Sequence, residues 1–217
     1  MIGLLGKKLG QTRVYDTNGV VIPVTVVLAG PNRVMQCKTV ESDGYSAVQL
    51  GFDDQKEHRV TKALRGHFLK HKSSPVKRVR EFRNFSLNVK PGDVIGANIF
   101  AQGDFVDAIG VTKGRGFEGV VKRHHFRGGD STHGSKGWHR RPGAIGQRLF
   151  PGTVRRGMRM PGHMGQVRRT VQNLQVVQVR ESDNVLLIKG AVPGAKGDYI
   201  VIREAKKMPK KSSPPAS

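Results

Sequence analysis

The sequence has few cysteines, aromatic residues and long apolar runs. Cys37 is the only cysteine in 217 residues, which excludes an internal disulfide and any zinc site built from several cysteines. This usage fits a reducing, cytosolic setting. Aromatic residues make up 6% of the chain, so we expect a mainly aliphatic core. No run approaches the roughly 20 apolar residues of a membrane-spanning helix, and the early Lys7 and Lys8 do not fit a secretory signal.

Acidic residues are also scarce. The chain has 16 Asp and Glu against 38 Lys and Arg, giving a formal net charge of +22. Such an excess makes isolated molecules repel one another and is typical of proteins that bind a polyanion. Nucleic acid is the leading candidate. An anionic membrane surface is the weaker alternative, because the basic residues lie in glycine-rich segments and not on an amphipathic helix.

The charge is concentrated between Thr112 and Arg169. These 58 residues contain 14 Lys and Arg, two acidic residues and 13 of the 28 glycines. Because so polar a segment buries little apolar surface, we expect it to be extended or disordered alone and to become ordered against a partner. Arg planes and aromatic rings stack on unpaired bases. We therefore interpret Trp138, the only tryptophan, as a residue placed against RNA and not as a core residue.

The flanking regions contain short apolar runs separated by turn residues. Asn18-Gly19 predicts a hairpin turn. This pattern indicates a mainly β fold, either an antiparallel barrel or a sandwich. The expected strands are Val20–Leu28, Arg33–Val40, Ser46–Phe52, Val94–Phe100, Phe105–Val111, Thr170–Val179, Asn184–Lys189 and Tyr199–Arg203.

One helix is expected, over Thr61–His71, with Ala63, Leu64, Phe68 and Leu69 near one face. Basic residues flank it, and they form either a solvated surface or a phosphate-binding surface. These residues are Lys56, Arg59, Lys62, Lys70, Lys72, Lys77, Arg78 and Arg80.

Three other patterns are better explained without catalysis or metal binding. Gly114–Gly119 matches the G-x-G-x-x-G dinucleotide pattern, but the acidic residue expected about 20 positions later is replaced by basic residues. Gly129–Lys136 has phosphate-loop spacing, but no strand precedes it. Five histidines, His124, His125, His133, His139 and His163, have no cysteine and only one carboxylate, Asp130, close to them, and no pair has metal-ligand spacing with a third partner. We expect Cys37 to be a buried structural thiol.

Several motifs resemble, in order, signatures of the bacterial large-subunit ribosomal protein L3 family. They are Met1–Arg13 (MIGLLGKKLGQTR), Gly114–Lys122, Thr132–Gly134, His139–Gln147, Met160–Gly165 and Lys189–Gly194.

The resemblance implies a translation-factor-like antiparallel β-barrel with a small α+β insert and a long irregular basic extension. It implies a structural protein of the large ribosomal subunit, in the cytoplasm, that takes part in early assembly and is not an enzyme. The barrel would contact the 3′ region of the large rRNA. The extension would reach toward the peptidyl transferase centre, near the entry side for aminoacyl-tRNA.

We divide the chain accordingly. Residues 1–111 plus 170–205 form the barrel domain, interrupted by an α+β insert at about 53–91. Residues 112–169 form the extension that penetrates rRNA, and residues 206–217 form a disordered basic tail. Some bacterial members carry a methylated glutamine two positions after an Ile-Gly-Gln motif, where this chain has Leu149, so we expect no such methylation.

The expected partners are large-subunit rRNA and neighbouring large-subunit proteins. We expect no cofactor, metal, membrane, small-molecule substrate or homo-oligomer. A nucleotide- or flavin-binding enzyme and a free nucleic-acid chaperone stay open as alternatives. The expected rRNA-binding residues are Lys7, Lys8, Arg13, Lys113, Arg115, Lys122, Arg123, His124, His125, Arg127, His133, Lys136, Trp138, His139, Arg140, Arg141, Gln147, Arg148, Arg155, Arg156, Arg159, His163, Arg168 and Arg169.

Overall fold

A computed structural model describes residues 1–71 and 73–208. The chain forms two compact units. We call Met1–Val111 together with the chain from Arg168 onward the barrel unit, and Thr112–Val167 the central unit. The predicted boundary at 169 is two residues late, because Arg168 already pairs with Val111 in the barrel. Most of the tail predicted at 206–217 lies outside the described residues.

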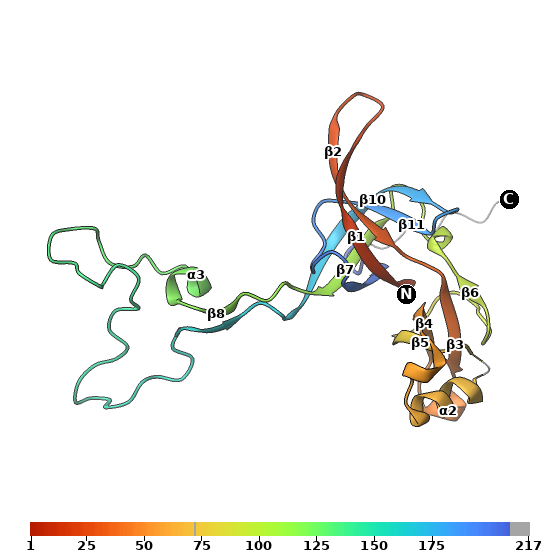
Figure 1. Ribbon diagram of the computed structural model, residues 1–217, viewed down its shortest axis with the longest axis horizontal. Helices are drawn as coiled ribbons and strands as arrows, with labels where there is room; N and C mark the ends of the chain where they lie inside the picture. The colour runs from red at the N-terminus through yellow and green to blue at the C-terminus, as the bar shows by residue number, and fades with distance from the viewer. Residues whose placement is uncertain (72, 209–217) are drawn as a thin grey trace. The chain divides into compact units, whose positions relative to one another are not determined.

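The barrel unit is built on a closed six-stranded antiparallel barrel, and the predicted mainly β fold class is confirmed. Around the barrel the strand order is β1-β12-β7-β10-β11-β2 (Figure 1). The strands are β1 (Gly3–Tyr15), β2 (Val21–Leu28), β7 (Phe105–Val111), β10 (Arg168–Arg180), β11 (Val185–Lys189) and β12 (Tyr199–Glu204).

Strand β1 was missed by sequence reasoning, although it is 13 residues long. Its first half pairs with β12, and its second half pairs with β2 through the predicted turn at Asn18-Gly19. Beyond a bulge between Lys8 and Gly10, most of its residues are exposed. The β1–β2 hairpin therefore continues past the barrel wall (Figure 1).

A second sheet of order β5-β4-β3-β6 packs against the barrel. It begins earlier than the insert predicted at about 53–91, because β3 and β4 pair with β5 and β6 and not with barrel strands. Only the start of the strand expected at Val94–Phe100 forms. The sheet and its helices are β3 (Asn32–Lys38), α1 (Val40–Asp43), β4 (Ala47–Asp54), η1 (Glu57–Arg59), α2 (Lys62–Lys70), β5 (Val76–Arg83), β6 (Val94–Ile95) and η2 (Ala97–Ile99).

The two faces of this sheet belong to different apolar clusters. Val34 and Leu50 join the barrel core with residues such as Ile202, whereas the adjacent Met35 packs with Phe68 on α2. Neighbouring strand residues point to opposite faces, so the sheet covers the barrel with one face and receives α2 on the other. The predicted helix is confirmed in place, but its packing was partly wrong. Phe68 is buried, whereas Leu64 is exposed.

Two polar groups join the barrel to the second sheet. Asn32 is fully buried, and its side-chain amide bonds to both the N–H and the C=O of Leu5 at 3.0 Å. Asp53 accepts hydrogen bonds from Tyr199 on β12 and Lys77 on β5. Burial alone would raise the pKa of Asp53, but these bonds and the charges of Lys77 and Lys7 lower it. Burial and the Asp53 carboxylate raise the pKa of Tyr199 to about 12.

The central unit has little regular structure. It contains β8 (Gly116–Glu118), α3 (Val120–His124) and β9 (Gly162–Met164), and a long irregular loop connects α3 to β9. Among the described residues of this unit only Val120 is buried. The unit therefore has almost no apolar core of its own, as its composition predicts.

Candidate nucleic-acid interface

The two ends of the central unit run side by side as a narrow ribbon. Strands β8 and β9 pair in antiparallel register, with Phe117 opposite His163. The backbone N–H of Thr112 donates to the carbonyl of Val167 at 3.0 Å. A side chain at Gly165, which has φ +81°, would overlap the carbonyl of Lys113. Glycine is therefore required there for the strands to approach so closely.

Two side chains of helix α3 bond to the chain segment that leads back to β9. The Arg123 guanidinium donates to the Met160 carbonyl at 2.7 Å, and His124 Nε2 donates to the same oxygen at 3.0 Å. Because a carbonyl only accepts, His124 must carry its proton on Nε2. Arg123 and His124 are half-buried. These two residues, which we expected to bind RNA, therefore also stabilise the central unit through their bonds to Met160.

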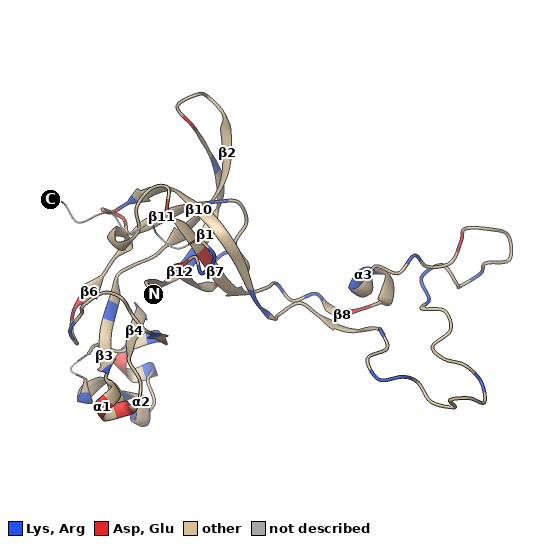
Figure 2. Cartoon of the chain, turned by 180° about the vertical axis from the view of Figure 1, so that it is seen from behind, with Lys and Arg blue, Asp and Glu red and all other residues tan. Residues whose placement is uncertain are grey.

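Charge in the central unit is almost unopposed. The unit has twelve Lys and Arg, the fourteen counted from 112 to 169 less Arg168 and Arg169. Its two acidic residues each pair with a neighbour, Glu118 with Lys122 and Asp130 with Arg127. Ten cations are therefore left without a carboxylate partner among the described residues of the unit. Figure 2 shows the basic positions recurring along the whole segment.

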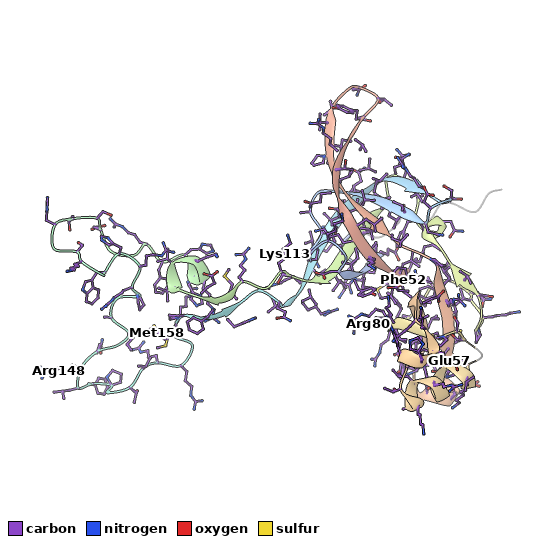
Figure 3. All side chains as sticks on the ribbon, viewed as in Figure 1. Phe52, Glu57, Arg80, Lys113, Arg148 and Met158 are labelled. Atoms are coloured by element: carbon purple, nitrogen blue, oxygen red, sulfur yellow. The ribbon has the colours of Figure 1, made fainter. Side chains whose placement is uncertain are left out.

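Most predicted contacts of this unit are exposed, and Lys113, Arg148 and Met158 mark the course of the chain in Figure 3. Their side chains are available to a partner. The exposed ones are Lys113, Arg115, Lys122, His125, Arg127, His133, Lys136, Trp138, His139, Arg140, Arg141, Gln147, Arg148, Arg155, Arg156, Arg159 and His163.

The loop narrows where Gly128 and Gly129 meet Trp138 and His139. The N–H of Gly129 donates to the His139 carbonyl at 3.1 Å. This bond closes a small loop that presents Trp138, whose side chain is 54% exposed. The Arg141 guanidinium lies 4.9 Å from the centre of the Trp138 ring. The exposed placement that we expected for Trp138 is therefore what the structure has.

The rRNA-binding residues expected in the barrel unit differ in how exposed their side chains are. Lys8 is buried, and its ammonium donates to the carbonyls of Val192 and Gly194 at 2.7 and 3.0 Å. We therefore remove Lys8 from the interface. Lys7 is half-buried and lies 3.9 Å from Asp53. The remaining three, Arg13, Arg168 and Arg169, are exposed.

Comparison with known proteins decides the family. The sequence profile described as Ribosomal protein L3 matches residues 77–185. The chain is 51% identical to a protein of Deinococcus radiodurans over 95% of this chain and 96% of that one. It is 48% identical to one of Nitrosococcus oceani and 50% identical to one of Pseudomonas fluorescens, over 95% of this chain and 97% and 98% of theirs. All three are described as Large ribosomal subunit protein uL3.

The chain belongs to the ribosomal protein L3 family.

Members of the L3 family are ribosomal proteins, which in bacteria work in the cytoplasmic ribosome and are not enzymes. This sets aside the nucleotide- or flavin-binding alternative. In the structure Gly114–Gly119 runs through β8 into α3, a helix of five residues, which is shorter than a dinucleotide site uses. Within the described part of the chain, no three His, Cys, Asp or Glu residues gather as a metal site would require. The same residues include no helix long and apolar enough to cross a membrane.

This L3 family member has a second basic surface, which is not among the expected rRNA-binding residues. Strand β5 is an edge of the second sheet and exposes Lys77, Arg78, Arg80 and Arg83. Its apolar residues, Val76, Val79 and Phe82, recur every third position, so the stretch has no alternating strand pattern, and its four cations and the lack of a hairpin signal hid the strand further. Lys77, Arg78 and Arg80 are among the basic residues that flank the expected helix. Lys72, which we grouped with them, lies outside the described residues.

Cys37 is half-buried, not buried as expected, and its Sγ donates to the Val89 carbonyl at 3.3 Å. Burial and, secondarily, the charge of Asp93 raise the pKa of its thiol. Both effects disfavour the reactive thiolate.

Proposed function

We propose that the chain is a structural constituent of the large ribosomal subunit, where it binds large-subunit rRNA mainly through the central unit. It supports early assembly, and its central unit reaches toward the peptidyl transferase centre. The observation that carries the proposal is the combination, in one unit, of ten cations without acidic partners and almost no buried residues. The names of the bacterial relatives agree with the large subunit.

The mechanism is electrostatic and architectural. Each Lys or Arg that meets a phosphate releases counterions, and this release allows rRNA segments to approach one another. Phosphate contacts position the protein without reading the sequence. Selectivity comes from RNA shape and from stacking on unpaired bases, for which the unit offers exposed rings such as Phe117 and Trp138. Ordering a segment without a core costs entropy, so many contacts must act together.

The first test is sedimentation of a lysate on a sucrose gradient after a high-salt wash. We expect the protein to stay with the large subunit. Release at moderate salt would refute an integral structural role and support the alternative of a free nucleic-acid chaperone.

A pair of matched variants then locates the contact. Replacing Arg155, Arg156 and Arg159 by Gln removes three exposed cations from the central unit. Replacing Arg78, Arg80 and Arg83 by Gln removes three from β5. For the purified protein binding large-subunit rRNA, we plot the logarithm of the binding constant against the logarithm of the salt concentration. Losing three phosphate contacts should make this negative slope shallower by roughly 2–3. We expect this change for the central-unit variant. A change confined to the β5 variant would place the main contact on the second sheet.

A further inference from the structure

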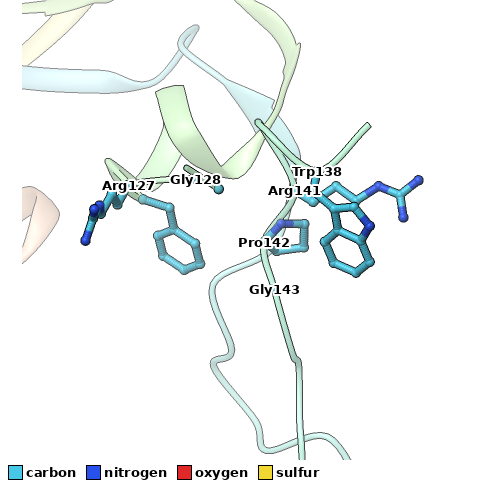
Figure 4. Close-up of a pocket in the computed structure, with 8 residues that line it drawn as sticks. Arg127, Gly128, Trp138, Arg141, Pro142 and Gly143 are labelled. Atoms are coloured by element: carbon cyan, nitrogen blue, oxygen red, sulfur yellow. The ribbon is translucent and has the colours of Figure 1, made fainter. Parts of the chain in front are cut away.

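A pocket of about 440 Å³ lies in the narrow loop of the central unit (Figure 4). Phe126 and Trp138 line it together with Pro142, and Arg127 and Arg141 supply the charge. The rest of the lining is glycine backbone, without any carboxylate side chain. Its volume lies in the range of about 300–1,000 Å³ that small-molecule and cofactor sites occupy.

The glycines determine how closely the two limbs of the pocket approach. A Cβ added at Gly129 would lie 2.9 Å from the Trp138 carbonyl oxygen, which belongs to backbone and cannot turn aside. A Cβ at Gly128 would collide with the His139 carbonyl, and Gly128 also has φ +81°. The segment that follows Phe126 therefore requires glycine at both positions to pack against the backbone of Trp138 and His139. The pocket is a consequence of this approach.

The residues that line the pocket favour a ligand with an aromatic ring and a negative charge. Two aromatic rings and a proline ring offer flat apolar contact, and the guanidinium groups are the only charged donors. Arg127 already pairs with Asp130 at 2.8 Å, whereas Arg141 forms no salt bridge with any acidic residue that the structure describes, and its guanidinium lies over Trp138. A ligand with a flat aromatic face and an attached negative charge satisfies both features. A nucleotide has both features, since its base stacks and its phosphate meets the guanidinium.

We propose that this pocket receives a single base splayed out of an RNA strand, with the adjoining phosphate against Arg141. The proposal rests on the proposed function, because it names the element of rRNA that one part of the central unit takes. Apart from the indole N–H of Trp138, the lining has no neutral polar side-chain group, so the pocket contacts mainly the face of the base and tolerates different bases.

Trp138 reports directly on this event, because it is the only tryptophan. The full chain is titrated at fixed salt with a short single-stranded RNA of mixed sequence. The comparison is an abasic strand of equal length, which keeps the sugars and phosphates but has no bases. Binding is followed by the anisotropy of a label on the RNA, and stacking by quenching of Trp138 emission. We expect both strands to bind and only the strand with bases to quench.

Two variants test the pocket itself without changing charge. Gly129→Ala forces the limbs apart, and Phe126→Leu keeps apolar volume but removes a ring. Gly146→Ala is the matched control, since the nearest atom to its Cβ would be 3.8 Å away in ordinary contact. We expect the first two to bind RNA yet lose most of the quenching, and the control to behave as wild type. Trp138→Ala should weaken binding of the strand with bases roughly fivefold or more, and leave the abasic strand unaffected.

Quenching by the abasic strand, or equal quenching in Gly129→Ala and wild type, would overturn the pocket proposal while leaving rRNA binding intact. Failure of the wild type to bind either strand, together with its absence from large subunits, would instead overturn the proposed function.

Discussion

The side-chain amide of Asn32 offers a sharp test of how the barrel and the second sheet are held together. Asn32 accepts a hydrogen bond from Leu5 N–H at 3.0 Å and donates to the carbonyls of Leu5 and Ala29 at 3.0 and 3.1 Å. All three residues are buried. The amide thus bonds to β1 much as a neighbouring strand would, while its own backbone begins β3.

Asn32→Ala leaves three buried backbone groups without these partners. Each such group costs about 1–3 kcal/mol, and carbonyls cost less than N–H groups because they retain a second lone pair. We therefore expect a loss of roughly 3–5 kcal/mol, a large part of the about 5–15 kcal/mol of a typical domain. Asn32→Asp should be worse, because it points a charged oxygen at two carbonyls.

Urea unfolding followed by circular dichroism measures this loss. With a slope of about 2 kcal/mol per molar, the midpoint should fall by roughly 2 M. Asn88→Ala is the control, because Asn88 is exposed and its loss should stay within about 0.5 kcal/mol. A loss below about 1 kcal/mol for Asn32→Ala would mean that water replaces the amide and that Asn32 is not the joint.

The remaining predictions concern the domain division and the pH dependence of stability. Val111 pairs directly with Arg168, so replacing residues 112–167 by an Asn-Gly turn should leave a soluble, folded barrel that fails to enter large subunits. Circular dichroism and sucrose gradients test this, and an unfolded product would show that our domain division is wrong. Asp53 has a lowered pKa, so its contribution to stability is present above its ordinary value near 3.8 and is lost as pH falls through the lowered value. Wild type should therefore lose more stability than Asp53→Asn between about pH 4 and pH 2 in urea titrations. Parallel curves would mean that the Asp53 contacts with Tyr199 and Lys77 do not stabilise the fold.

Much of the fold was predictable where a strand is also a local apolar run. The expected bounds of β7, Phe105–Val111, match the structure, and β2, β11 and β12 differ by one residue. These strands carry β-branched residues in a half-buried setting, which favours strand locally. The pattern at Val94–Phe100 misled us, because the chain leaves the sheet at Gly96 and η2 follows, with the Ala97 N–H donating to the Asn184 side chain.

Strand β1 shows why the rest could not be predicted. Its sequence GLLGKKLGQTRVY contains three glycines and three cations, which break any alternating pattern. It is a strand because β12 and β2 pair with its two halves, and these partners are distant in the sequence or follow the turn. The sequence also could not place β3 and β4. A half-buried strand has the same apolar pattern whether it pairs within the barrel or within a second sheet.

The sequence by itself determined that the protein carries a concentrated positive charge and that the segment Thr112–Arg169 cannot build a core. Both follow from composition, because charge and apolar content add up whatever the fold. Only the tertiary structure decided which cations are free to meet a partner. It buries Lys8 against two carbonyls and uses Arg123 and His124 to hold Met160. It also brings Gly128 and Gly129 against Trp138 and His139 to form a pocket, since approach between residues ten positions apart depends on how the chain bends.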